Sequence, residues 1–156
     1  MELVFDIETD AVEATKVWCI VAYDIEKEKI YSFKPDELDA GVSLLTKLIG
    51  HNIVGFDVPM IKKFFNVDLA ETATLIDTLV LSRLFNPTRE GGHALAGWGY
   101  RLGHPKGDFK EFTEYTEEMM KYCINDVLVN AKVFQHLKQE SKGFSAQSVE
   151  IEHKVA

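Results

Sequence analysis

The apolar positions of the chain first predict a set of strands. Residues 2–7, ELVFDI, form an almost continuous apolar run, which is typical of a strand buried on both faces of a sheet. VWCIVAYD (17–24) and KIYSF (29–33) are rich in β-branched and aromatic residues and flank a short charged turn, so we expect a hairpin. NIVGF (52–56) and ATLID (73–77) predict one short strand each.

Apolar residues at helical spacing lie between and after these runs. A first helix is expected to begin near Pro35 and to end at Gly50. A second begins at DVPMIKKFF, with Asp57 as its N-cap and Pro59 in its first turn. The longest expected helix runs from about residue 117 to 141 and has two glutamates in its first turn. Strands followed by strand–helix alternation indicate an α/β domain with a mixed sheet.

Composition limits the kind of protein this can be. The 156 residues, of which 46% are hydrophobic, suffice for one domain with a real core. We expect no signal peptide and no membrane span, because no long apolar segment occurs. Cys19 and Cys123 lie in unrelated patterns, which fits a reducing, cytoplasmic compartment. The net charge of −8 predicts weak binding of nucleic acid by this chain alone, because Lys and Arg drive binding to phosphates.

The tripeptide Asp-Ile-Glu occurs twice, at 6–8 and at 24–26. In a strand, both copies would place their two carboxylates on one face, so spacing does not separate them. The second copy lies in the expected hairpin turn beside Lys27 and Lys29, which predicts a solvated turn. The first copy ends a buried strand and has no basic neighbour before Lys16. Two carboxylates there repel each other and need a cation.

Two more acidic residues occupy informative positions. Asp57 follows an expected strand, where the roles of helix cap and site residue are compatible. Asp126 lies in the long helix, four residues after Tyr122, so the carboxylate and the phenol share one helix face. The surrounding stretch is otherwise apolar, so this face borders the core. Each of these residues alone is weak evidence for a site.

Taken in order, these motifs resemble those of the DEDD superfamily of 3′–5′ exonucleases, the DnaQ-like proofreading domains. The family motifs are D-x-E, an Asn shortly before an aromatic-Asp pair, and Y-x-x-x-D, which marks the tyrosine subtype. The matching positions are Asp6, Glu8, Asn52, Phe56, Asp57, Tyr122 and Asp126. The resemblance implies an α/β domain with a ribonuclease H-like mixed sheet of about five strands flanked by helices.

Four other stretches resemble the exonuclease domain of family A DNA polymerases from short-tailed lytic phages. They are IDTLVLSRLF (76–85), HALAGWGYRLG (93–103), TEEMM (116–120) and VEIEHKVA (149–156). The last is similar to the segment that leads into the polymerase region of those enzymes. We therefore expect an exonuclease domain over 1–143 and a tail over 144–156 that resembles the start of an absent polymerase domain. The loops at 86–92 and 103–113 look shorter than in some relatives. The sequence therefore does not decide whether these two loops contact DNA.

The resemblance also implies a mechanism and a substrate. Two Mg²⁺ ions, for which Mn²⁺ would substitute, are expected on Asp6, Glu8, Asp57 and Asp126, and carboxylate oxygens suit such ions. Tyr122 would orient the attacking water together with Glu8, because a phenol with an ordinary pKa of about 10 is a poor general base. The expected substrate is a single-stranded or frayed DNA 3′ end, shortened to nucleoside 5′-monophosphates. The expected partner is a DNA polymerase domain or subunit in a bacterial cytoplasm, without membrane contact.

The sequence indicates the residues that contact the substrate less clearly than it indicates the acidic residues. The candidates are Thr9, Val12, Asn52 and Phe56, for which packing and loop roles are equally compatible with the sequence. Trp98 and Tyr100 offer stacking surfaces, but their helical spacing favours the core. Arg101 and Lys106 are candidate phosphate contacts or ordinary surface charges. Asp77 is most simply a helix cap.

Two other functions stay open. The same chemistry could act on RNA 3′ ends, because no residue here decides the sugar. Alternatively, the domain could be an inert exonuclease-like scaffold. We disfavour the scaffold, because an inert domain has no physical need to keep four mutually repelling acids.

Overall fold

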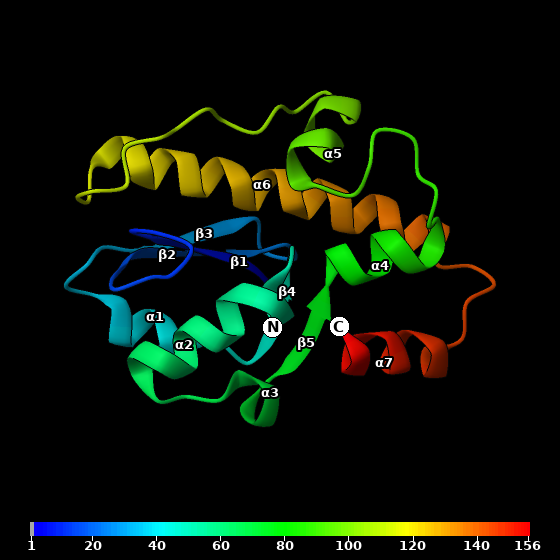
Figure 1. The fold of residues 1–156 in the computed structure, drawn as a ribbon, viewed down its shortest axis with the longest axis horizontal. Coiled ribbons are helices and arrows are strands. Elements are labelled where there is room, and N and C mark those ends of the chain that lie inside the picture. Colours follow the sequence, from blue (N-terminus) through cyan, green and yellow to red (C-terminus); the bar gives the residue numbers. More distant parts are fainter. Residues whose placement is uncertain (1) are drawn as a thin grey trace.

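The computed structural model describes residues 2–156 and is built around one five-stranded sheet (Figure 1). The strands are β1 (Glu2–Thr9), β2 (Val17–Asp24), β3 (Lys29–Phe33), β4 (Lys47–Gly50) and β5 (Thr74–Asp77). Their order is β3-β2-β1-β4-β5, so β1 is central. β1 pairs antiparallel with β2 and parallel with β4, which makes the sheet mixed, as the sequence predicted.

Helices cover both faces of the sheet (Figure 1). The longest, α6 (Glu117–Glu140), lies across one face, whereas α1 (Leu38–Leu44) and α2 (Val58–Phe65) cover the other. Alternation along β1 explains this division, because successive side chains point to opposite faces. Phe5 packs into the cluster that includes α1 and α2, and Val4 packs into the cluster formed with α6. Even-numbered residues of β1 therefore face α6.

The remaining helices complete the domain. They are α3 (Leu69–Thr72), α4 (Thr78–Phe85), α5 (Leu95–Arg101) and α7 (Ala146–Val155). Side chains of α4 and α5 pack with α6 in a third cluster, and α7 lies beside α4 (Figure 1). Within residues 2–156, no helix is both long enough and apolar enough to cross a bilayer.

Two expected elements were wrong. The segment 35–50 is not one helix, because α1 ends at Leu44 and residues 47–50 form β4. An apolar run of this length fits either element, and pairing with β1 and β5 decides for a strand. The expected strand at 52–56 is instead a π-helical turn, η1 (Ile53–Asp57). Asn52, with a φ of 61°, turns the chain out of β4 immediately before it.

In the second Asp-Ile-Glu copy, Glu26 and the turn after it are exposed, as expected, but the expectation was wrong for Asp24. Asp24 is only 2% exposed. Its Oδ1 accepts hydrogen bonds from the backbone N–H groups of Glu26 and Lys27, at 3.0 and 3.2 Å. The carboxylate therefore caps the β2–β3 turn through backbone donors, as short acidic side chains often do.

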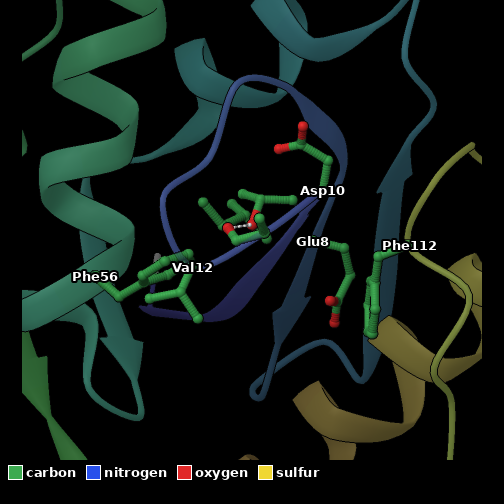
Figure 2. A pocket seen from close by; sticks show the side chains of 8 residues that line it. Glu8, Asp10, Val12, Phe56 and Phe112 are labelled. Atoms are coloured by element: carbon green, nitrogen blue, oxygen red, sulfur yellow. Dashed lines mark hydrogen bonds between the residues drawn. The ribbon is translucent and has the colours of Figure 1, made fainter.

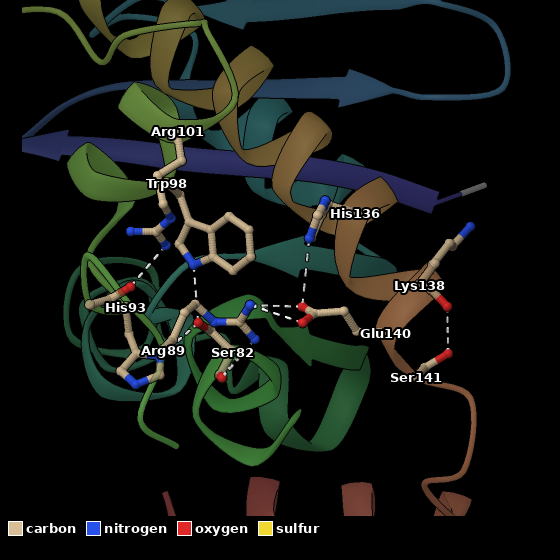
Figure 3. A network of polar contacts seen from close by, with 10 residues as sticks. Ser82, Arg89, His93, Trp98, Arg101, His136, Lys138, Glu140 and Ser141 are labelled. Carbon is tan, nitrogen blue, oxygen red and sulfur yellow. Dashed lines mark hydrogen bonds and ion pairs between the residues drawn. The ribbon is translucent and has the colours of Figure 1, made fainter. Parts of the chain in front are cut away.

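A polar network fixes the loop that precedes α5 (Figure 3). Arg89 lies 2.9 Å from Glu140 of α6 and 4.5 Å above the Trp98 ring. Trp98 is 2% exposed and donates to Ser82 Oγ at 3.0 Å, which confirms its core role. Arg101 donates to the Gly92 carbonyl at 2.9 Å, so it braces this loop.

Tyr100 differs from Trp98 in this respect. We expected helical spacing to place both aromatic rings in the core. Tyr100 is 83% exposed, so its expected core role was wrong. Trp98 and Tyr100 are two residues apart on α5, so their side chains project from different faces of the helix. Only the face of Trp98 is buried in the core.

Candidate active site

The carboxyl end of β1 carries the first two acids of the site. Asp6 and Glu8 share the strand face toward α6. The thiol of Cys123, on α6, lies 3.8 Å from Asp6 Oδ2. One ligand atom from each of Asp6, Glu8 and Cys123 lies within 4.8 Å of the other two. The register between β1 and β2 shifts between Glu8 and Thr9, so the strand changes direction directly after the acids.

The long helix α6 brings the third acid to the same place. Asp126 is 3% exposed and lies one turn after Tyr122. Its negative charge raises the pKa of both Asp6 and Glu8, in each case after the larger effect of burial. The two motifs that are more than a hundred residues apart in the sequence therefore form one electrostatic cluster.

The fourth acid, Asp57, lies near Asp6 and comes from η1, a segment separate from β1 and α6. It ends η1, directly before α2, and is 3% exposed. Burial raises its pKa well above the ordinary value, and the nearby Asp6 adds to the rise. The expected role as the N-cap of α2 was wrong, because the Asp57 backbone is already helical and its side chain caps no N–H group. Its carboxylate is thus left for the site.

Burial and mutual repulsion make these carboxyl groups hard to ionise. Burial raises the pKa of Asp6 to about 8 and that of Glu8 to about 10. Burial also raises the pKa of Asp126 to about 6, although the nearby Lys106 opposes the rise. Protons or cations must therefore neutralise the cluster at neutral pH.

The donor set fits a hard divalent cation. Asp57 Oδ2 and Asp126 Oδ1 are buried oxygens without a hydrogen-bond partner in the described part of the chain. Such orphaned acceptors are uncommon in native proteins and call for a ligand. Carboxylate oxygens are the ligands that Mg²⁺ and Mn²⁺ prefer. Among the described residues, Asp6 and Glu8 have ligand atoms within 4.8 Å of each other, and Asp57 and Asp126 offer further carboxylate oxygens to an ion at this place.

A pocket of about 290 Å³ opens beside the acids (Figure 2). Its walls come from the end of β1, the loop after it, η1 and the segment before α6. The lining residues are Ile7, Glu8, Thr9, Asp10, Ala11, Val12, Phe56 and Phe112. Figure 2 shows Val12 and Phe56 together at one side and Glu8 and Phe112 at the other. The structure thus brings Thr9, Val12 and Phe56 to one pocket.

Asn52 does not line this pocket. Its backbone N–H donates to Asp77 Oδ1 at 2.9 Å, and it borders a separate hollow with His51 and His93. Asp77 also accepts from Val54 N at 3.0 Å and caps α4 through Leu79 N. The expected cap is therefore confirmed, and it also fixes the turn that presents Asp57.

Sequence reasoning missed two residues of the site. Phe112 lines the pocket, and its carbonyl accepts a hydrogen bond from Trp18 Nε1 at 2.8 Å. Cys123 packs against Asp6 from α6. The only sequence signal for Phe112 is an aromatic residue in a stretch without periodicity. Cys123 gave no signal beyond its place next to Tyr122.

Comparison with known proteins agrees with this geometry. No family model matches the chain. The DNA-directed DNA polymerase of Escherichia phage T7 is 30% identical to it over 220 residues, which cover 99% of this chain and 31% of the polymerase. The chain thus spans about a third of the length of this relative. The matched region takes in nearly all of this chain, which supports the resemblance seen in its motifs.

The motifs, the phage relative and the structural neighbours together support a DnaQ-like exonuclease domain of the DEDD superfamily. Solved structures show the same ribonuclease H-like fold. The Brucella melitensis protein NrnC with bound Mg²⁺ has a TM-score of 0.74 and 16% identity, over 98% of this chain and 80% of NrnC. Trypanosoma brucei RNase D in complex with RNA U12 has a TM-score of 0.61 and 15% identity, over 87% and 55%. Tyr122, four residues before Asp126, assigns this exonuclease domain to the tyrosine subtype.

Proposed function

We propose that this exonuclease domain removes nucleoside 5′-monophosphates from single-stranded or frayed DNA 3′ ends, using two divalent metal ions. One observation carries the proposal: buried Glu8, Asp57 and Asp126 lie near the half-buried Asp6, and one carboxylate oxygen each of Asp57 and Asp126 has no hydrogen-bond partner among the described residues. Bound Mg²⁺ or Mn²⁺ would supply the positive charge that an in-line displacement at phosphorus requires.

The chain's own side chains would position the attacking water. Glu8 and Tyr122 are the proposed positioning residues, with Tyr122 on α6 opposite the end of β1. Burial raises the pKa of Tyr122, so its phenol stays protonated at neutral pH. A protonated phenol can donate a hydrogen bond but cannot accept the water's proton as a base. Tyr122 therefore orients the water in this proposal.

The pocket beside the acids is the proposed place of the terminal nucleotide. Phe56 and Phe112 lie at its two sides (Figure 2), and aromatic faces hold unstacked bases. Val12 lines the same pocket and is 84% exposed, so its side chain is accessible to a bound nucleotide. Stacking on the two rings would contribute about 1–3 kcal/mol per contacted base.

We propose DNA rather than RNA as the substrate because of the relative found by sequence comparison. The similar chain from phage T7 is a DNA polymerase, and it aligns with 99% of this chain. We propose a polymerase domain or subunit as partner, with a proofreading role, and residues 144–156 as the segment that leads toward it. Such a partner would supply the basic surface that a chain with a net charge of −8 lacks.

RNA is the second candidate substrate. The structurally similar RNase D was solved with RNA U12, and its fold matches that of this chain. An inert scaffold remains the third alternative. A direct digestion experiment separates all three.

The experiment digests a 5′-labelled single strand in Mg²⁺ and compares wild type with Asp126→Asn. We expect stepwise shortening from the 3′ end by wild type, none in EDTA, and a loss of at least about a hundredfold in Asp126→Asn. Asp24→Asn is the matched control, because Asp24 is equally buried and Asn keeps its Oδ1 acceptor. Its rate should equal that of wild type.

An RNA strand of the same sequence is digested in parallel. Faster shortening of RNA than of DNA would transfer the assignment to exoribonucleases. Shortening that continues in EDTA would exclude the metal mechanism, and no shortening of either strand would favour the scaffold.

A further inference from the structure

One basic side chain reaches into the acidic cluster. Lys106 Nζ lies 3.2 Å from Asp126 Oδ2, and within residues 2–156 this is the one ion pair that involves the four acids. The same ammonium donates a hydrogen bond to the hydroxyl of Tyr122 and lies 4.3 Å from the centre of its ring. Only 25% of the Lys106 side chain is exposed. A surface lysine would have its ammonium in water, so this geometry requires a cause.

The cause is a segment clamped between α5 and α6. Asn125, next to Asp126, donates to the Pro105 carbonyl at 3.1 Å, and its Oδ1 pairs with His104 Nε2 at 2.8 Å. The backbone N–H of His104 donates to the Gly99 carbonyl at 2.9 Å. The residues before Lys106 are therefore fixed to both helices, and Lys106 is presented to the acids by a rigid backbone.

Close packing confirms that this segment has little freedom. A Cβ atom added at Gly99 would lie 2.7 Å from the His104 carbonyl oxygen and 3.1 Å from the Lys106 nitrogen. A Cβ atom added at Gly107 would lie 3.2 Å from the Tyr122 ring. Both glycines allow the backbone to approach the helices that carry the site. The lysine position is thus built into the fold and does not depend on a flexible side chain alone.

We propose that Lys106 is a positioning residue that acts as the resident counter-cation of the acidic cluster. Its ammonium holds Asp126 and Tyr122 in place, and it competes with divalent ions for the negative charge of Asp126. This inference rests on the proposed metal-dependent function. Lys106 engages Oδ2 of Asp126, whereas Oδ1 has no partner, so the two oxygens are divided between the ammonium and an incoming ion. Tyr122 Oη accepts from Lys106, which leaves its own O–H free to point toward the water.

Two opposite consequences follow from removing this ammonium. Divalent ions should bind more tightly, because a positive charge a few ångströms from their site is gone. Turnover should fall, because Tyr122 and Asp126 lose the group that aligns them. A merely structural lysine would not tighten ion binding when it is removed.

The test measures Mn²⁺ binding by isothermal titration calorimetry on the full chain, without nucleic acid. We expect Lys106→Met to bind Mn²⁺ about tenfold more tightly than wild type. Lys121→Met is the matched control: it removes the same charge from an exposed position on α6, and its affinity should stay within about twofold of wild type. Lys106→Arg keeps the charge and should also keep the wild-type affinity.

Kinetics on a labelled strand supply the second measurement. Lys106→Met should lower kcat about tenfold or more with little change in KM, whereas Lys121→Met should change neither. If the wild type is active but Lys106→Met binds Mn²⁺ no more tightly than the wild type does, the counter-cation role of Lys106 is overturned and the proposed function stands. A wild type that binds Mn²⁺ but shortens no strand overturns the proposed function and leaves the affinity test decisive. A wild type that binds no Mn²⁺ overturns both.

Folding is checked by circular dichroism before either measurement. If Lys106→Met does not fold, Lys106→Gln, which retains a polar end, is judged by the same affinity criterion. Tighter binding supports the proposal, and unchanged or weaker binding excludes it.

Discussion

At the scale of single residues, the partners of a buried carboxylate decide its role in this protein. Asp126 and Asp24 are both aspartates with an exposed fraction of 2–3%, yet their surroundings differ. Asp24 accepts two backbone hydrogen bonds, from Glu26 and Lys27. Asp126 has one partnerless oxygen and stands among other acids. The same residue type is therefore a structural cap at one position and an ion ligand in our proposal at the other.

The raised pKa values predict how stability depends on pH. An unfolded carboxyl group has a pKa of about 4. The folded pKa is about 6 for Asp126 and about 8 for Asp6, so the folded state holds protons that the unfolded state has lost. Stability contributed by these protons is complete below about pH 4 and is lost as the pH rises toward 8.

We therefore expect the melting temperature of the protein in EDTA to fall by about 5 °C or more between pH 5 and pH 9. Mg²⁺ should oppose this fall, so its stabilising effect should grow with pH. Thermal melts with and without Mg²⁺ measure both effects, and Asp6→Asn should flatten the dependence in EDTA. A melting temperature that rises with pH in EDTA would show that the cluster does not bind these protons.

At the scale of elements, the site depends on one short turn. η1 places Asp57 opposite β1, and Asp77 at the end of β5 holds that turn by accepting from the backbone of Asn52 and Val54. The same carboxylate caps α4 through Leu79 N. Parallel pairing of β4 with β5 brings Asp77 to this edge. One side chain thus links strand, turn and helix behind the acids.

Asp77→Ala should therefore lower the free energy of unfolding by about 3 kcal/mol, because it leaves three backbone donors without their acceptor. It should also reduce exonuclease activity, since Asp57 loses its support. Urea denaturation and strand digestion measure the two effects. Asp68→Ala removes the cap of α3, which is one hydrogen bond from Ala70 N, and a solvent-exposed ion pair with Lys62, so it should cost only about 1 kcal/mol and leave activity intact. Equal costs for the two variants would contradict the linking role.

At the scale of the whole molecule, charge limits what this chain does alone. Its 25 acidic residues exceed its 17 Lys and Arg residues, and several of the basic side chains are already engaged. Arg89 pairs with Glu140, and Arg101 stacks over Trp98. The excess of acidic residues therefore weakens the attraction of this chain for a phosphate backbone. In our proposal, bound ions, the pocket beside the acids and a polymerase partner compensate for it.

We expect Asp126→Asn, which binds without cleaving, to bind single-stranded DNA more weakly than about 1 µM at physiological salt in EDTA. Fluorescence anisotropy with a labelled strand measures this affinity. A fused or added polymerase domain should tighten it. Sub-micromolar binding by the isolated chain without metal would contradict the charge argument.

The local pattern of residues was enough to predict much of this protein. The buried strand at residues 2–7, the long helix near 117–141 and the motif order that resembles the DEDD exonucleases were all readable from the chain. These features are local: strand alternation, helical period and motif spacing depend on residues near one another in the sequence. The same local rules could not distinguish helix from strand at 47–50, because only pairing with β1 and β5 settles that segment.

The tertiary structure alone decided which side chains meet. Phe112 and Lys106 lie near the acids although their segment carries no motif, and Cys123 contacts Asp6 from a position that the Y-x-x-x-D motif leaves unspecified. The burial of Asp24 could not be read from its charged turn. Contacts of this kind join residues far apart along the chain. They depend on how the helices pack on the sheet, so no local pattern encodes them.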